Sequence, residues 1–153
     1  MRVVAGSDHA GLSLKGSLVE RLRAEGVDVV DMGTLDAGAV DYPDFAHRVA
    51  QAVSRDPRLV GLLVCGTGVG MSMSANRHAG VRAVVCSEAY SAAMARAHNN
   101  ANVLCLGARV VGLGLAQTIL EAFLSGSFEG GRHARRVQKI ELPTEPSTEP
   151  SSA

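Results

Sequence analysis

The sequence predicts an α/β fold built on a parallel sheet of about five strands. Short apolar runs rich in Val alternate along the whole chain with longer segments of helical spacing. The chain is 46% apolar but only 3% aromatic and has no Trp, so its core must be aliphatic. That composition suits a β-branched sheet covered by Ala- and Leu-rich helices. At 153 residues the chain is long enough to bury one such core.

Each expected strand is a short apolar run that ends at a glycine, a cysteine or an aspartate. The runs are 3–5, 27–30, 60–64, 81–85 and 103–106. Because helical segments separate them, right-handed crossovers should make neighbouring strands parallel. The pattern leaves the order of the strands in the sheet open.

Three of the connecting segments show clear helix signals. In the first, Leu14, Leu18 and Leu22 share one helical face, and Lys15 is among the polar residues between them. The second opens with Pro43 between two aspartates, a pattern typical of a helix N-terminus. The third has amphipathic spacing over 113–124.

The pattern changes after Gly126. Residues 126–142 form a basic arm with a double glycine and few core residues, so we expect it to lie on a surface or on a partner subunit. Residues 143–153 contain a TEPS repeat rich in Pro, Ser and Glu, and we expect this tail to be disordered. The predicted domain is therefore 1–142.

Charge and cysteine content narrow the classes of partner. Lys plus Arg and Asp plus Glu both total 15, so the neutral chain offers no electrostatic reason to expect a nucleic acid or a membrane surface. No apolar run approaches the roughly 20 residues of a membrane span. The N-terminus runs directly into a strand pattern, and the three cysteines form no CxxC pair. We expect a cytoplasmic protein with reduced thiols.

The segment 65–70, CGTGVG, follows the third expected strand, where parallel sheets bind ligands. Its alternate glycines let successive backbone N–H groups face an anion at a helix N-terminus. It lacks the Lys-Ser/Thr of a nucleotide P-loop and the spacing of the dinucleotide fingerprint. A tight strand-to-helix turn is the alternative reading of the glycines alone.

Cys65 gives this loop a chemical candidate. A thiol at the start of a helix has its thiolate favoured by the helix dipole, so it can act as a base. The same N–H groups could hold the oxyanion that forms when a proton leaves carbon next to a carbonyl. A buried, unreactive cysteine is the alternative, and it is the reading for Cys86 and Cys105.

Other ionisable residues stand near strand ends. Asp8 and His9 follow the first expected strand, His98 precedes the fifth, and basic residues crowd into 132–139. We expect the strand-end residues to gather at one edge of the sheet. Taken singly they could be a helix cap, core imidazoles or a solvated helix face. Together with the thiol and the glycine loop, they match a phosphorylated carbonyl substrate.

Six motifs occur in a fixed order along the chain: GSDHAG (6–11), DYPD (41–44), CGTGVGMS (65–72), NRHAGVRA (76–83), HNNANVLCLGAR (98–109) and GGRHARR (130–136). With them, roughly residues 2–140 resemble the type B ribose-5-phosphate isomerases, a family that includes galactose-6-phosphate isomerase subunits. The resemblance implies a Rossmann-like three-layer α/β/α sandwich. It also implies a homodimer, or a pair of such dimers, with shared active sites, and a sugar-phosphate substrate. No cofactor and no metal are implied.

The resemblance also implies catalytic roles. Cys65 would move the proton between C1 and C2 of the sugar. His98 with Asp8 would open the furanose ring, and Thr67 would assist near the ring oxygen. Some family members replace the cysteine by serine and use a glutamate six residues later, but this chain has Cys65 and Met71.

The implied binding residues fall into two groups. Those for the enediolate are Gly66, Gly68, Val69, Gly70 and Asn99. Those for the phosphate are His9, Arg132, Arg136 and, from the second subunit, Arg109, with Tyr42 lining the pocket.

Three other functions remain open on the sequence alone. An isomerase of a 6-phosphohexose, such as allose or galactose 6-phosphate, would use the same residues with a deeper pocket. A non-catalytic nucleotide-binding module would use only the GxGxG loop. A metalloenzyme would combine His9, His98 and a cysteine, although no HxxxH or CxxC spacing supports it.

Overall fold

The computed structural model describes residues 1–141 and confirms the parallel α/β fold. The strands are β1 (Arg2–Ser7), β2 (Asp28–Asp31), β3 (Leu59–Cys65), β4 (Ala83–Val85) and β5 (Val103–Gly107). They form one parallel sheet in the order β2-β1-β3-β5-β4. The tail 143–153, which we expected to be disordered, lies outside the described residues.

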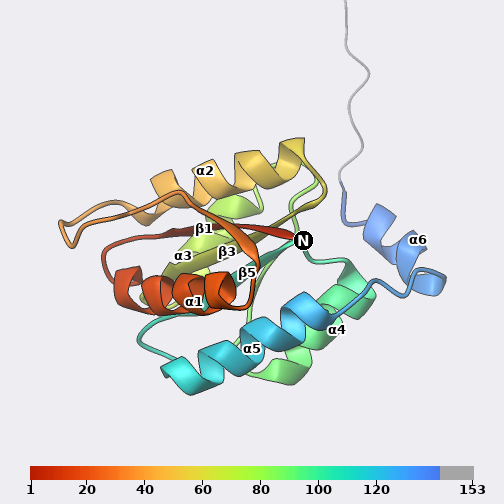
Figure 1. Ribbon diagram of the computed structural model, residues 1–153. Coiled ribbons are helices and arrows are strands. Elements are labelled where there is room, and N and C mark those ends of the chain that lie inside the picture. Colours follow the sequence, from red (N-terminus) through yellow and green to blue (C-terminus); the bar gives the residue numbers. More distant parts are fainter. Residues whose placement is uncertain (142–153) are drawn as a thin grey trace, which may run out of the picture.

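The helices cover both faces of this sheet. They are α1 (Leu12–Ala24), α2 (Tyr42–Arg55), α3 (Val69–Ala75), α4 (Ala89–Asn99), α5 (Leu113–Ser125) and α6 (Arg132–Gln138). One face carries α1, α4 and α5, and the other carries α2 and α3 (Figure 1). The three-layer sandwich is therefore confirmed. No helix within 1–141 is long and apolar enough to cross a bilayer.

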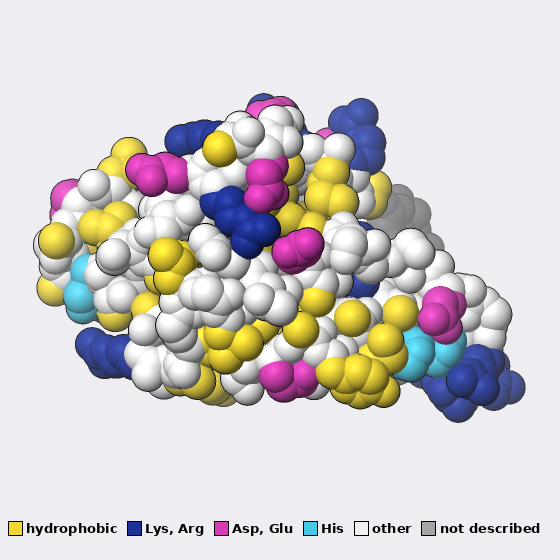
Figure 2. Space-filling model, turned by 60° about the horizontal axis from the view of Figure 1, so that its bottom comes forward, with side chains coloured by type: hydrophobic (Ala, Val, Ile, Leu, Met, Phe, Trp, Pro, Cys, Tyr) yellow, Lys and Arg dark blue, Asp and Glu magenta, His cyan; other side chains and the backbone are white. Residues whose placement is uncertain are grey.

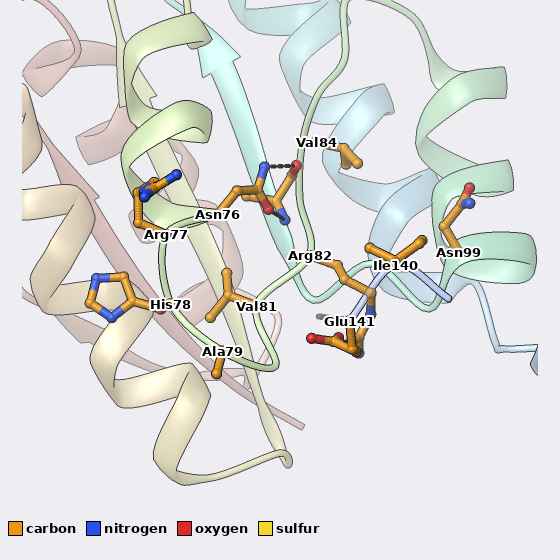
Figure 3. Close-up of a pocket in the computed structure, with 11 residues that line it drawn as sticks. Asn76, Arg77, His78, Ala79, Val81, Arg82, Val84, Asn99, Ile140 and Glu141 are labelled. Carbon is orange, nitrogen blue, oxygen red and sulfur yellow. Dashed lines mark hydrogen bonds and ion pairs between the residues drawn. The ribbon is translucent and has the colours of Figure 1, made fainter. Parts of the chain in front are cut away.

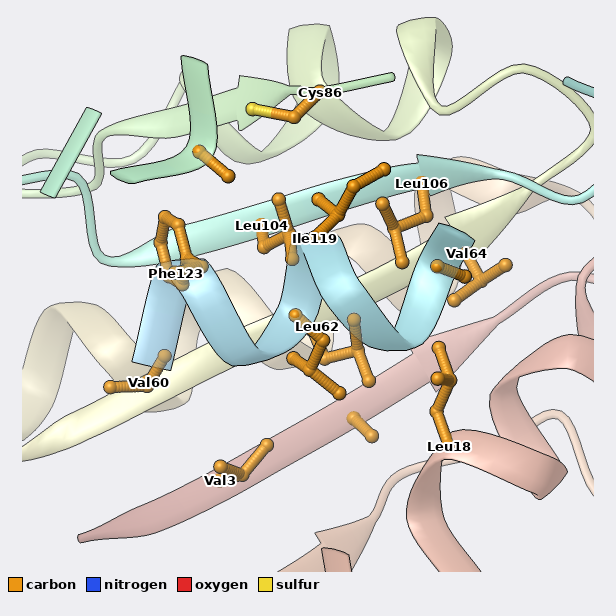
Figure 4. Close-up of a cluster of buried hydrophobic side chains, with 14 of the residues drawn as sticks. Val3, Leu18, Val60, Leu62, Val64, Cys86, Leu104, Leu106, Ile119 and Phe123 are labelled. Atoms are coloured by element: carbon orange, nitrogen blue, oxygen red, sulfur yellow. The ribbon is translucent and has the colours of Figure 1, made fainter. Parts of the chain in front are cut away.

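The core is aliphatic on both faces, as the composition predicts. On one face, Ile119 and Phe123 of α5 project onto Leu62 of β3 and Leu104 of β5 (Figure 4). On the other, α2 approaches so closely that a Cβ added to Gly61 would lie 3.0 Å from the Val49 side chain. The central strands β3 and β5 are thus buried on both sides, which explains their unbroken apolar runs.

Two details differ from the sequence pattern. The fourth strand begins at Ala83 rather than at residue 81, because the Val81 N–H closes a turn onto the His78 carbonyl. The Arg82 N–H donates to the Asn102 side chain instead of a neighbouring strand. The basic arm forms α6 against the end of α4, and only His133 of that helix is buried.

The switch point of the sheet lies between β1 and β3. From β1 the chain passes through α1 on one face, whereas from β3 it passes through α3 on the other. In open α/β sheets a crevice at the carboxyl ends of two such strands is the usual ligand site. Here the β1–α1 connection touches the end of β3, since a Cβ on Gly11 would overlap the Val64 carbonyl oxygen.

Lys15 is buried, although the sequence pattern placed it among polar residues of α1. Its Nζ donates to Asp31 Oδ1 at 2.5 Å and to the Thr34 carbonyl at 2.8 Å. The side chain is only 1% exposed. This ammonium ties α1 to the end of β2 and to the segment 32–41 that leads into α2.

Replacing Lys15 with Met should lower the free energy of unfolding by about 3 kcal/mol, because it leaves the Asp31 carboxylate and the Thr34 carbonyl without their buried partner. Arg2→Met is the matched control, since the Arg2–Asp28 pair has side chains 55% and 64% exposed. The control should change stability by less than about 1 kcal/mol. Urea unfolding followed by circular dichroism measures both, and equal effects would contradict the buried anchor.

Candidate active site

Cys65 ends β3 and turns its thiol toward the following glycine loop. Gly68 has a φ of +80°, a conformation that favours glycine, and its N–H donates to Cys65 Sγ at 3.0 Å. Gly68 also begins α3, so the sulfur lies at the positive end of that helix. The Cys65 side chain is buried. The loop therefore places a hydrogen-bond donor and the start of a helix at the sulfur.

Arg109 lies against this loop from the end of β5. Its backbone N–H donates to the Gly66 carbonyl at 3.0 Å, and its Nη1 is 3.4 Å from where a Cβ on Gly66 would stand. We expected Arg109 to act from a second subunit beside His98. Within its own chain Arg109 lies beside Gly66, because it follows the carboxyl end of β5, the strand next to β3.

Tyr42, at the start of α2, places its ring against Gly70. A Cβ on Gly70 would lie 2.5 Å from Tyr42 Cε2, so only glycine leaves room for the ring. Thr67 is exposed on the same loop, and its Oγ1 accepts from the Val69 N–H at 3.3 Å. Tyr42, Thr67 and Gly70 thus meet beside Cys65.

Asp8 and His9 enter the crevice from the β1–α1 connection. Asp8 is buried; its N–H donates to the Val64 carbonyl and its Oδ1 accepts from the Gly11 N–H at 2.9 Å. His9 is exposed, and its Nδ1 accepts from the Val40 N–H at 3.3 Å. That bond assigns the proton of a neutral His9 to Nε2, which can donate to an anion.

His98 lies at the opposite end of the sheet from Cys65. The helix α4 carries the chain back to the amino ends of the strands, and His98 is near its C-terminus. The next residues confirm the location, because Asn102 accepts from the N–H of Gly61 near the start of β3. The expectation that this segment shares one edge of the sheet with Cys65 is wrong within a single chain.

A second cluster surrounds His98 at that end. Its ring stacks on His133 with centroids 4.2 Å apart and planes 2° apart. Glu129 Oε2 lies 3.8 Å from the Nε2 of each histidine. Burial, together with the positive charges of Arg132 and Arg136 and the His98 ring, lowers the pKa of His133. At the right of Figure 2, over α4 and α6, histidines lie beside an acidic side chain and a group of basic ones.

Arg132 and Arg136 project from α6 into solvent. Within 1–141 neither guanidinium pairs with a carboxylate, and the same is true of Arg109. Unpaired guanidinium groups are suited to bind a phosphate through two parallel hydrogen bonds.

Asn99 borders a hollow of about 480 Å³ at this amino end (Figure 3). Arg82 on its wall forms an ion pair with Glu141 at 2.8 Å, so that charge is already neutralised. The wall has no thiol and no glycine loop. Of the site residues expected from the sequence, only Asn99 lines this hollow.

Cys86 and Cys105 are buried free thiols. Burial and the nearby Glu88 raise the pKa of Cys86 to about 11. Complete burial, with the two neighbouring cysteines, raises the pKa of Cys105 further. Both thiols stay protonated at neutral pH, so the unreactive reading holds for them.

The sequence pattern assigned no role to Gly107, Glu129 or His133. A Cβ on Gly107 would lie 2.8 Å from the Thr67 backbone, so this glycine lets the Thr67 loop lie against β5. Glu129 precedes α6, so helical spacing does not explain why it lies beside His133, and the sequence held no local signal for this pair.

Comparisons with known proteins agree with this geometry. The family model described as ribose/galactose isomerase matches residues 3–140. Ribose-5-phosphate isomerase B of Escherichia coli is 50% identical over 139 residues, which cover 91% of this chain and 93% of that protein. The Clostridium thermocellum ribose-5-phosphate isomerase B structure has a TM-score of 0.90 and 48% identity, covering 92% of this chain and 95% of its own. A Mycoplasma genitalium ribose-5-phosphate isomerase B structure with bound ribulose 5-phosphate has a TM-score of 0.89 and 45% identity. The match covers 91% of this chain and 93% of that one.

Iodoacetamide should alkylate Cys65 of the folded protein and spare the other two cysteines. With a pKa of about 11, only about one Cys86 thiol in a thousand is ionised at about pH 8. Mass spectrometry of peptides from native and urea-unfolded protein measures the labelling at each position. Equal native labelling at Cys65 and Cys86 would contradict the selective activation of Cys65.

Proposed function

Since the chain belongs to the ribose/galactose isomerase family, we propose that it is an aldose–ketose isomerase that interconverts ribose 5-phosphate and ribulose 5-phosphate. The observation that carries this function is the Cys65 thiol held by the Gly68 N–H in a glycine loop at the switch point of the sheet. Relatives named ribose-5-phosphate isomerase B support the choice of substrate.

The reaction needs one base and one oxyanion site. The Cys65 thiolate takes the proton from C2 of the open-chain aldose, and the electron pair of that bond forms the C1–C2 double bond of an enediolate. The thiol then returns the proton to C1, while a proton moves from O2 to O1 to give the ketose. The Gly68 N–H faces Sγ and the Val69 N–H faces Thr67 Oγ1, so the oxyanion falls to the remaining N–H groups around Gly70.

The phosphate needs donors that do not take part in proton transfer. His9 offers Nε2–H, and Arg109 offers a guanidinium from the same chain. The two arginines of α6, Arg132 and Arg136, complete the phosphate site in our proposal. They lie with His98 at the far end of their own chain.

A single chain cannot unite these parts. The seven residues of β3 span roughly 20 Å at about 3.3 Å each, far beyond hydrogen-bond reach. We propose a homodimer in which the α4–α6 end of one chain covers the Cys65 crevice of the other. There His98 with Asp8 opens the furanose ring, Thr67 assists at the ring oxygen and Asn99 binds the enediolate. Exposed apolar side chains at Val69 and Met73 of α3 and Tyr90 of α4 support a contact surface.

The three free thiols support a reducing compartment, and we propose the cytoplasm. The 6-phosphohexoses stay the competing substrates, because they would use the same thiol and the same guanidiniums. The ratio kcat/KM for ribose 5-phosphate, allose 6-phosphate and galactose 6-phosphate distinguishes them. It should be largest for ribose 5-phosphate.

Replacing Cys65 with Ala should leave a folded protein whose kcat is at least about 100-fold lower, the usual scale for a general base. Cys105→Ala is the matched control, since that thiol is buried and stays protonated. It should reduce stability but keep most of the activity. An active Cys65→Ala enzyme would identify Cys65 as a packing residue, and activity on none of the three sugars would refute the isomerase.

The shared site has its own test. In a heterodimer of Cys65→Ala with His98→Asn, one site carries both lesions and the other carries none. Random mixing of equal amounts makes half of the dimers heterodimers, so about one quarter of wild-type activity should return. Steady-state rates after co-refolding, with subunit exchange verified by mass spectrometry, measure it. No recovery despite exchange would mean that each chain holds a complete site.

A further inference from the structure

The cluster of His98, Glu129 and His133 contains the ligand atoms of a metal site. One atom from each residue lies within 4.8 Å of the other two. Glu129 Oε2 stands 3.8 Å from both Nε2 atoms. Two imidazoles and one carboxylate are a common ligand set for Zn²⁺, whose bonds of about 2.0–2.2 Å place tetrahedral ligand atoms roughly 3.4 Å apart. The carboxylate therefore needs to move only slightly.

The protonation of His133 also suits a metal. Its Nε2 accepts from Arg132 Nε at 3.4 Å, so this nitrogen carries the lone pair that a metal requires. A metal ion would replace this hydrogen bond, and the exposed Arg132 side chain would have to move aside.

Two features make the site adaptable rather than rigid. The stacked rings are parallel, so their lone pairs point side by side and one ring must tilt to share an ion. His98 can do so because its side chain is 37% exposed, and Glu129 is 58% exposed and open to solvent. The nearby Arg132 and Arg136 charges oppose a cation. A reversible site fits these features better than a structural one.

We propose that these three residues bind a single Zn²⁺ ion, or a transition-metal ion of the same class, and that the ion inhibits the enzyme. The inhibition rests on the proposed function, in which His98 opens the sugar ring. An ion held on His98 Nε2 occupies the lone pair that proton transfer needs. The metal is thus an inhibitor of a reaction that itself proceeds without one.

The test uses the full-length protein after EDTA treatment and Zn²⁺ as the probe. Equilibrium dialysis in the Cys65→Ala background measures binding without the reactive thiol, and initial rates of the Cys65 enzyme measure inhibition. We expect one ion per chain and full recovery of the rate with EDTA. Glu129→Gln and His133→Phe should each weaken Zn²⁺ binding at least about tenfold. Changing a residue that only supports a metal ligand already costs about that much, and these two residues are proposed as ligands themselves.

The variants separate this cluster from other causes. His133→Phe keeps a ring to stack on His98, and Glu129→Gln alters a side chain that is 58% exposed. Each is compared with its own zinc-free rate. His78→Asn is the control, because it removes the other histidine pair, in which His47 Nδ1 lies 2.8 Å from His78 Nε2. It should bind Zn²⁺ like the wild type.

Two results would overturn the proposal. One is unchanged zinc affinity in Glu129→Gln, and the other is loss of binding in His78→Asn. If the wild type does not isomerise ribose 5-phosphate, the proposed function fails, and dialysis still decides the metal site.

Discussion

The parallel sheet is the constraint on which the site depends. All five carboxyl ends face one way, so every connecting helix must return the chain to the other side. Residues that follow a strand, such as Asp8 and Cys65, therefore meet in the crevice. Residues that close a return helix, such as His98, are carried away from it. A reaction that used both kinds of residue would need two copies of the fold, which is the reason for the shared site that we propose.

Close packing of backbone on backbone shapes the crevice itself. Gly11 lets the β1–α1 connection touch the end of β3, and Gly107 lets the Thr67 loop lie on β5. Gly68 turns its N–H onto the sulfur through a positive φ. At these positions any side chain would separate the loops. These glycines therefore let the loops stay in contact, and the chemistry that we propose for Cys65 depends on them as much as on the thiol.

Much of this arrangement could be predicted from the sequence, because it is encoded locally. The strand runs, Pro43 at the start of α2 and the glycine loop after β3 are all signals within a few residues, and the structure confirms them. Lys15 could not be placed, since its burial depends on Asp31 and Thr34 across a helix and a strand. The position of Arg109 beside Gly66 of its own chain follows from strand order, which the pattern left open. His98 was expected at the wrong edge of its own sheet, because a residue that precedes a parallel strand lies at the amino ends and not at the carboxyl ends.

The location of α6 has a consequence for how the enzyme responds to dilution. If the guanidiniums and His98 serve the neighbouring chain, a lone subunit holds only half of the needed groups at either end. Activity per chain then falls with the fraction of dimer, so it follows mass action rather than staying constant as the protein is diluted. Folding and activity become separable quantities, because a subunit can keep its intact sheet and core while it has no complete site. Cellular abundance would act as a control on catalysis, set by the dissociation constant of the pair.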